Sequence, residues 1–170
     1  MSNVMQAATT MTIDGQARAT RGGKYLTFAL GKEEYGLEIL KVREIIGFME
    51  ITAIPRTADY IRGVINLRGQ VISVVDLRAK FGMADVERTD QTCIIVVETR
   101  DGDRKLNTGI IVDHVSEVLN IAGEQIEPAP ALGGTDGAII LGMAKVGQAV
   151  KILLDIDEVL AGVEAARLAA

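Results

Sequence analysis

Few residues in this chain could carry out covalent chemistry. Its 170 residues include a single histidine, His114, and a single cysteine, Cys93. One residue of each type cannot assemble a metal site of the Cys/His kind, and a Cys–His nucleophilic pair is not expected. The sequence contains neither a Walker-type phosphate loop nor a GxGxxG fingerprint. We therefore predict that the protein is not an enzyme and uses no cofactor and no metal ion.

The carboxylates offer one pattern that resembles a catalytic pair. Asp76 and Asp155 each follow an apolar run with strand character. Two carboxylates could act as general acid and base. An aspartate at the end of a strand also commonly caps the turn or helix that follows, because its side chain accepts hydrogen bonds from backbone N–H groups. We favour this structural role for both residues.

The most informative charged residue is Arg68. Two apolar, β-branched segments flank Arg68-Gly69, which predicts a β-hairpin with its turn at that dipeptide. Gly69 provides the positive φ that such a turn usually needs. Almost every position from Val71 to Leu77 is apolar, which predicts a strand buried on both faces. No feature of the turn requires an arginine, so Arg68 is either functional or simply a solvated turn residue.

Composition narrows the class of protein further. Hydrophobic residues make up 48% of the chain but aromatic residues only 4%, so the core must consist of Val, Ile and Leu, which favours strands. The net charge of −5, without a basic run, argues against binding to nucleic acid or to anionic membranes. We expect a soluble, cytoplasmic protein with no signal peptide and no direct membrane insertion. Cys93, within an apolar run, is expected to be a small buried hydrophobic residue.

Apolar segments separated by polar turns predict mainly β-structure. A short helical turn running into a strand is expected at 40–46, and a second helical turn at 157–160. The expected polar linker covers 84–90, and the Gly133-Gly134 region is expected to be a loop. Strands are expected at residues 25–30, 35–39, 51–54, 92–99, 109–112 and 115–119, with hairpins centred on Arg68-Gly69 and within 142–156.

The second half of the chain repeats the first. A shift of 73 positions places Gly36, Val42, Glu44 and Pro55 on Gly109, Val115, Glu117 and Pro128. A shift of 79 positions places the run 63–77 on 142–156 without gaps, so that Asp76 falls on Asp155 and Arg68 falls on Gly147. Matched Gly, Glu, Pro and Asp residues make chance similarity between two Val/Ile/Leu-rich segments a weak explanation.

The repeat predicts two small five-stranded β-barrels. The first is expected at 24–88 and the second at 89–161, preceded by a disordered leader at 1–23 and followed by a tail at 162–170. A barrel of about 65 residues is close to the lower size limit for an independent core, so the two barrels should pack together. Because Gly147 stands where the first copy has Arg68, the hairpin itself does not need the arginine.

Several runs resemble the CheW family of chemotaxis coupling proteins. They are 63–69 (GVINLRG), 74–78 (VVDLR), 34–36 (EYG), 40–45 (LKVREI) and 112–118 (VDHVSEV), and the resemblance extends over about 24–160. It implies two SH3-like five-stranded barrels, in agreement with the repeat. It also implies a scaffold that couples the cytoplasmic tips of transmembrane, methyl-accepting chemoreceptors to the regulatory domain of the histidine kinase CheA. Ser73, where a proline is common, and His114, where small residues are frequent, depart from the family pattern.

The same resemblance implies partner-binding residues. Arg68 corresponds to an arginine implicated in coupling, and Glu44 to the acidic residue with which it forms an ion pair. Val42 and Val115 are expected either to line a groove between the barrels or to belong to the core. The implied partner-binding set is Ile39, Val42, Glu44, Gly63, Arg68, Gly69, Val115 and Val118.

A small barrel that binds a ligand or a nucleic acid is the alternative, and it would need exposed aromatic and basic side chains on one face. An enzyme would need a pocket with convergent titratable groups. The sequence leaves several questions open: the receptors served, the barrel that binds each partner, any exchange of strands between the barrels, the oligomeric state, and whether the termini order on binding.

Overall fold

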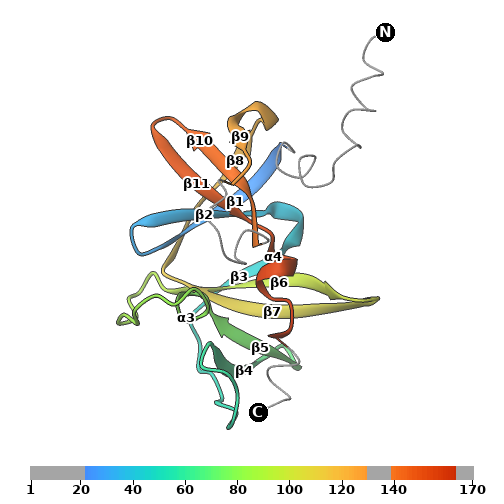
Figure 1. The fold of residues 1–170 in the computed structure, drawn as a ribbon. Coiled ribbons are helices and arrows are strands. Elements are labelled where there is room, and N and C mark those ends of the chain that lie inside the picture. Colours follow the sequence, from blue (N-terminus) through green and yellow to red (C-terminus); the bar gives the residue numbers. More distant parts are fainter. Residues whose placement is uncertain (1–21, 130–138, 164–170) are drawn as a thin grey trace.

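The computed structural model describes residues 22–129 and 139–163 (Figure 1). The expected leader up to residue 21, the Gly133-Gly134 loop and the tail from residue 164 lie outside these ranges. The strands are β1 (Gly23–Leu30), β2 (Glu33–Glu38), β3 (Val42–Gly47), β4 (Ile61–Leu67), β5 (Gln70–Asp76), β6 (Cys93–Asp101), β7 (Arg104–Val112), β8 (His114–Ile121), β9 (Ile126–Glu127), β10 (Ile140–Val146) and β11 (Ala149–Leu154). Short helices are η1 (Ile39–Lys41), α3 (Leu77–Lys80), η2 (Gly123–Gln125) and α4 (Ile156–Val159).

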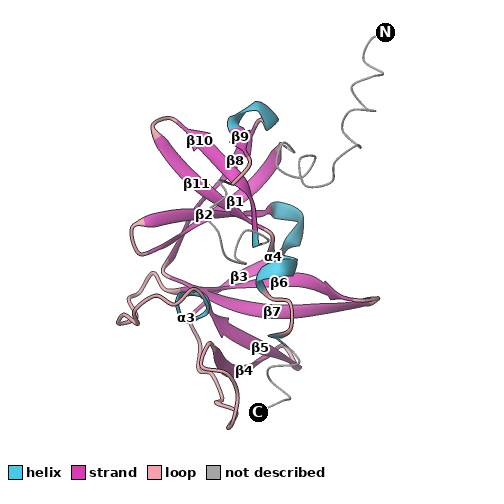
Figure 2. Cartoon of the chain, viewed as in Figure 1, coloured by secondary structure: helices cyan, strands magenta, loops and turns pink. Residues whose placement is uncertain are grey.

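The strands form two sheets, as expected for two SH3-like barrels. One sheet has six strands in the order β8-β1-β2-β11-β10-β9, and the other has five in the order β3-β6-β7-β5-β4. Figure 2 shows that strands dominate and that the helices are confined to short segments between them. In Figure 1 the six-stranded barrel is the upper half and the five-stranded barrel is the lower half. The predicted helical turn leading into a strand is confirmed as η1 followed by β3.

The two sheets do not coincide with the consecutive stretches 24–88 and 89–161. Strands β1 and β2 belong to the sheet that contains β8 to β11, while β6 and β7 join β3, β4 and β5. Four pairings join strands of the two halves: the antiparallel pairs β1 with β8 and β3 with β6, and the parallel pairs β2 with β11 and β7 with β5. The repeat identifies which strands are equivalent, but equivalent strands offer the same local pairing energy within one copy or between copies. The sequence therefore could not decide the exchange.

The repeat itself is confirmed by matched details of the two sheets. In the parallel pairs, Gly36 lies opposite Leu153, and its counterpart Gly109 lies opposite Val74, the counterpart of Leu153. The pairing of β4 with β5 shifts register between Ile61 and Gly63, and that of β10 with β11 shifts at the equivalent place, between Ile140 and Gly142. Asp76 and Asp155 cap α3 and α4, which confirms their structural role.

Three apolar clusters form the core. One lies inside the six-stranded barrel and includes Tyr25 and Leu153, and one lies inside the five-stranded barrel and includes Val74 and Ile94. The largest, which we call the seam cluster, is shared by both barrels and contains Leu26, Phe28, Leu30, Leu37, Ile61, Val75, Leu77, Ile95, Val97, Ile110, Val112, Leu154, Ile156, Val159, Leu160 and Val163. The expectation that the barrels pack through a hydrophobic seam is confirmed.

The glycines at the parallel pairings leave room for the side chains of the core. A Cβ on Gly109 would lie 2.8 Å from Cγ2 of Ile94, and one on Gly36 would lie 2.8 Å from Cδ2 of Leu153. Leu153 can rotate its terminal methyl group away, whereas the branched side chain of Ile94 is fixed close to the backbone. Gly47, in contrast, has open space around the equivalent point.

We predict that Gly109→Ala destabilises the protein more than Gly36→Ala does. Overpacking of a core of this kind costs roughly 1–3 kcal/mol. Gly47→Ala is the control, and it should be neutral or stabilising by about 0.4–1 kcal/mol because it restricts the unfolded chain. Urea denaturation of the three variants measures the order. Equal stabilities for all three would show that neither parallel pairing is tightly packed.

Candidate partner-binding surface

Arg68 and Glu44 form the ion pair that the family resemblance implies. Nη2 of Arg68 donates to both carboxylate oxygens of Glu44, at 2.5 and 2.7 Å. The pair joins the tip of the β4–β5 hairpin to β3, and β3 and β4 are the two ends of the five-stranded sheet. The Arg68 side chain is 70% exposed. The pair therefore fastens the barrel closed at its surface and leaves one face of the guanidinium open to solvent.

The backbone at the turn has a conformation that glycine adopts more easily than arginine. Arg68 has φ 53° and Gly69 has φ 88°, a combination typical of a type I′ turn. The left-handed region costs a residue with a Cβ about 1 kcal/mol relative to glycine. Gly147, at the equivalent turn of the other barrel, adopts φ 62° without that cost.

Gly63 and Gly69 both have backbone reasons to be glycine. Gly63 is buried with φ 140°, and a Cβ on it would lie 2.0 Å from the carbonyl oxygen of Thr52. Thr52 and Val64 form an isolated bridge beside it, so the close approach is part of the barrel wall. Gly69 is exposed with open space around it, and its N–H donates to Oδ1 of Asn66 at 2.8 Å.

Ile39, Val42 and Val115 lie where the chain passes from one sheet to the other. All three are half-buried and pack against the seam cluster, so Val42 and Val115 contact the core and also reach the surface. A cavity of about 400 Å³ opens beside Ile39, Leu40 and the start of β1. Leu40 is 90% exposed, the most exposed large apolar side chain among the described residues. The sequence reasoning did not single it out.

Exposed apolar side chains occur at the same positions in both barrels. Ile45 and its counterpart Val118 are 45% and 50% exposed, and Val71 and its counterpart Val150 are 64% and 52% exposed. We call these four residues the repeated apolar positions. The exposure of Val71 corrects the prediction of a strand buried on both faces. Alignment of the two copies pairs these positions, but it also pairs buried ones such as Val74 and Leu153, so only the structure shows that the four are exposed.

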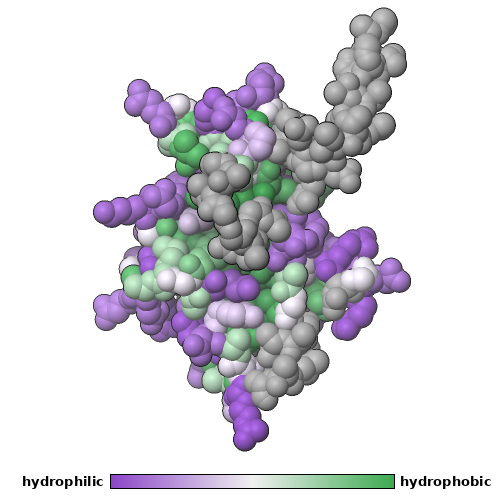
Figure 3. Space-filling view, in the orientation of Figure 1, coloured by the Kyte–Doolittle hydropathy of each residue, from purple (hydrophilic) through white to green (hydrophobic). Residues whose placement is uncertain are grey.

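A second cavity, of about 360 Å³, lies at the waist between the barrels. Its lining includes Tyr35, Phe81, Met83, Ile139, Ile152 and Val159, while Val42 and Val115 do not line it. Figure 3 shows apolar surface at this waist between hydrophilic residues that project from both barrels. Within 22–129 and 139–163, no cluster of His, Cys, Asp or Glu could hold a metal ion. No helix in these ranges is long and apolar enough to cross a membrane.

Known proteins share both the sequence and the fold. The CheW-like domain model matches residues 24–164. The chain is 42% identical to the chemotaxis protein CheW of Klebsiella aerogenes over 156 residues, which cover 91% of this chain and 92% of that protein. The chain belongs to the CheW-like family.

Two further relatives extend the CheW-like comparison. The chemotaxis protein CheW of Bacillus subtilis is 36% identical over 114 residues, 67% of this chain and 70% of that protein. The crystal structure of the scaffolding protein TtCheW from Thermoanaerobacter tengcongensis superimposes with a TM-score of 0.74 at 35% identity, covering 83% of this chain and 94% of that one.

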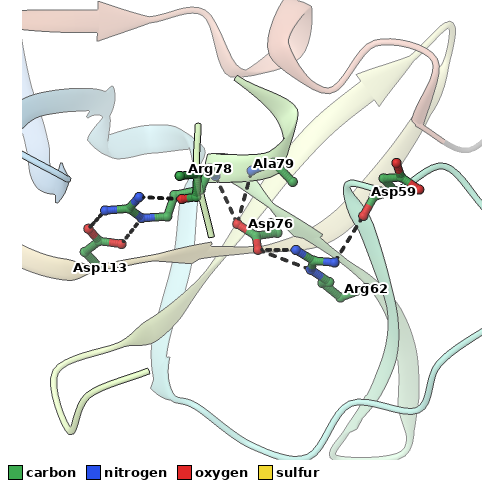
Figure 4. Close-up of polar contacts among 7 residues, drawn as sticks. Asp59, Arg62, Asp76, Arg78, Ala79 and Asp113 are labelled. Carbon is green, nitrogen blue, oxygen red and sulfur yellow. Dashed lines mark hydrogen bonds and ion pairs between the residues drawn. The ribbon is translucent and has the colours of Figure 1, made fainter. Parts of the chain in front are cut away.

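The CheW-like chain also holds a polar network beside α3, drawn in Figure 4. Asp76 accepts hydrogen bonds from the N–H groups of Arg78 and Ala79 and from the guanidinium of Arg62. Nε and Nη2 of Arg78 donate to the two carboxylate oxygens of Asp113 at 2.9 and 2.7 Å. The hydrogen bond from Arg78, assisted by one from the Gly31 N–H, lowers the pKa of Asp113 even though burial opposes the shift. The same pairing raises the pKa of Arg78.

Cys93 is half-buried against the seam cluster, and burial raises the pKa of its thiol. A raised pKa disfavours the thiolate, so this residue packs as a small hydrophobic side chain.

We predict that Arg68→Ala lowers the free energy of unfolding by no more than about 1 kcal/mol, because an exposed ion pair contributes little. Arg68→Gly removes the same ion pair but also relieves the positive-φ strain, so it should be at least as stable as Arg68→Ala. Urea denaturation compares the two variants. Global unfolding of Arg68→Ala would instead make Arg68 a strut of the core.

The pH dependence of stability should report Asp113. Because its pKa is lower in the folded state, its contribution is present above the unfolded value of about 4 and is lost as pH falls through the folded pKa. Asp113→Asn should therefore be less stable than the parent near neutral pH, and the difference should shrink below about pH 4. Denaturant titrations across this range test it. A difference that is independent of pH would assign the loss to packing.

Proposed function

We propose that this chain is a non-enzymatic adaptor in the cytoplasm that couples chemoreceptors to the histidine kinase CheA at receptor arrays. The relatives are named chemotaxis proteins, and one is described as a scaffolding protein. A bridging protein needs two surfaces that are not equivalent. The observation that carries the proposal is that each barrel exposes two of the repeated apolar positions, while among the described residues only the five-stranded barrel has an arginine–glutamate pair at its hairpin tip.

In this proposal, the kinase regulatory domain and the receptor tip both bind through apolar contacts. Ile39, Val42 and Val115 are candidates for the receptor's helical tip, since an amphipathic helix can lay an apolar stripe against half-buried side chains. Glu44 and Arg68, with the turn at Gly69, are candidates for kinase coupling. Val118 is a candidate contact on the six-stranded barrel. Gly63 supports this surface because its lack of a side chain lets the carbonyl oxygen of Thr52 lie close to its backbone.

The positions of the aromatic residues support an adaptor over a nucleic-acid-binding barrel. All six aromatic residues of the chain lie within the described ranges, and none is exposed. Phe28, Tyr35 and Phe81 contact one another, with ring centroids 5.8 and 5.9 Å apart along the series. Because Phe28 is completely buried, this series serves the core rather than base stacking.

We predict that Val71→Asp and Val150→Asp weaken binding to different partners. Both residues are exposed, so both variants should fold, and each serves as the matched control for the other. Isothermal titration calorimetry with a receptor-tip fragment and with the isolated regulatory domain of CheA measures the affinities. Arg68→Ala should weaken kinase coupling, and the parent's affinities should change little with salt because the contacts are apolar.

Two results would contradict the adaptor proposal. If Val71→Asp and Val150→Asp both leave both affinities unchanged, the repeated apolar positions are not partner surfaces. If the parent chain binds neither fragment, the coupling function itself is excluded for these partners. A steep fall in affinity between low and physiological salt would show that charge, not apolar area, holds the partners.

A further inference from the structure

The chain passes between the two sheets at two places, and each place carries an ion pair. The first crossing is η1, between β2 and β3, and the second is Asp113, between β7 and β8. The short helices α3 and α4 follow β5 and β11 and approach these crossings. The residues that hold the crossings were not among those predicted from the sequence.

At the second crossing, Asp113 joins three segments. Its carboxylate accepts the two hydrogen bonds from Arg78 of α3, drawn in Figure 4, and one from the N–H of Gly31 at 2.8 Å. Arg78 follows the five-stranded sheet, whereas Gly31 is in the β1–β2 turn of the six-stranded sheet. The Asp113 N–H also donates to the carbonyl of Ala29 in β1. Asp113 therefore fastens one barrel to the other.

At the first crossing, the same arrangement occurs with the carboxylate on the other partner. Nζ of Lys41 in η1 donates to Oδ2 of Asp157 in α4 at 2.6 Å. Oδ1 of Asp157 accepts the N–H of Arg100 in β6 at 3.1 Å. Here α4 follows the six-stranded sheet and Arg100 belongs to the five-stranded sheet, so Asp157 also fastens one barrel to the other.

We call the two ion pairs at the crossings, Arg78 with Asp113 and Lys41 with Asp157, the clasps. Their polarity is inverted. The shift of 79 positions that aligns the hairpins places Arg78 on Asp157, so the helix supplies the cation in one clasp and the anion in the other. The crossing supplies Asp113 in one case and Lys41 in the other. The crossing residues are not equivalent in the repeat, because the shift of 73 positions places Lys41 on His114 and Leu40 on Asp113. The preserved feature is an ion pair between helix and crossing, not the identity of its members.

We propose that these two clasps set the angle between the barrels and thereby hold Val42 and Val115 in the arrangement that binds a partner. The seam cluster is apolar and non-directional, so by itself it permits the barrels to rotate against each other. Charge-assisted hydrogen bonds with a paired geometry are directional. Val42 directly follows Lys41, and Val115 lies two residues after Asp113. The assignment of Val42 and Val115 to binding rests on the proposed function, whereas the role in orientation does not.

The angle between the barrels can be measured without a partner. In a Cys93→Ser background, spin labels at Gln70→Cys and Gln148→Cys report the distance between exposed positions, one in each barrel. Double electron–electron resonance of the parent should give one narrow distance distribution. Asp113→Asn with Asp157→Asn removes the negative charge and one acceptor oxygen from both clasps while keeping side-chain volume, and it should broaden the distribution. Glu127→Gln, which removes an ion pair to Lys145 within the six-stranded sheet, is the matched control and should leave it narrow.

A charge swap separates ion pairing from packing. The double variant Arg78→Asp with Asp113→Arg gives the second crossing the polarity of the first. Its distance distribution should be narrower than that of either single variant. A narrow parent-like distribution in the variant without clasps would overturn the proposal. If that variant does not fold, the single Asp113→Asn and Asp157→Asn variants decide, and unchanged distributions in both would overturn it equally.

Binding provides the second measurement. If loss of the clasps leaves the competent angle populated about a tenth of the time, the affinity for the receptor-tip fragment falls about tenfold. If the distance distribution broadens but the affinity is unchanged, the clasps set the angle between the barrels, and their proposed role in binding is overturned. A parent chain that binds no partner would remove the proposed function but leave the distance measurement valid.

Discussion

The seam cluster is the constraint on which the rest of this structure depends. A barrel of this size buries too little apolar surface to be stable by itself. The largest of the three core clusters lies between the two barrels and is shared by them. The exchange of strands strengthens this dependence. Because β2 pairs with β11 and β5 pairs with β7, neither half of the chain contains all the strands of either barrel. The two barrels form one unit in which the core of each requires the other half of the chain.

Polar groups arranged around the seam supply what an apolar core cannot. Burial of Val, Ile and Leu is favourable over a range of relative positions, whereas an arginine that donates two hydrogen bonds to a carboxylate is satisfied in few. Arg78 with Asp113 and Lys41 with Asp157 lie where the chain changes sheet. The apolar seam therefore holds the barrels together, and in our proposal the ion pairs fix the angle between them.

Duplication of the barrel also explains how one small protein presents two different surfaces. The repeated apolar positions are preserved in both copies, so each barrel exposes apolar side chains at equivalent positions. The difference lies at the hairpin tip, where Arg68 pairs with Glu44 in one barrel and Gly147 leaves Glu117 without that partner in the other. Arg68 occupies a backbone conformation that glycine would adopt more easily, and its side chain provides the ion pair to Glu44.

Local patterns in the sequence determined much of this protein. Alternation and turn residues placed most strands, the η1–β3 transition and the hairpin at Arg68-Gly69, but the strand expected at 51–54 is wrong, because only Thr52 forms an isolated bridge there. The matched residues established the repeat and the capping roles of Asp76 and Asp155. Comparison of the copies singled out Arg68, and the family resemblance supplied Glu44 as its partner. Each of these depends on neighbouring residues or on a residue-by-residue comparison.

Only the tertiary structure decided which copy each strand pairs with, because equivalent strands satisfy the same hydrogen bonds in either arrangement. It also decided that Val71 is exposed, that Gly63 is required by the carbonyl of Thr52, and that Arg78 meets Asp113. These outcomes depend on the distance between residues far apart in the chain. The pattern of a single strand carries no information about that distance.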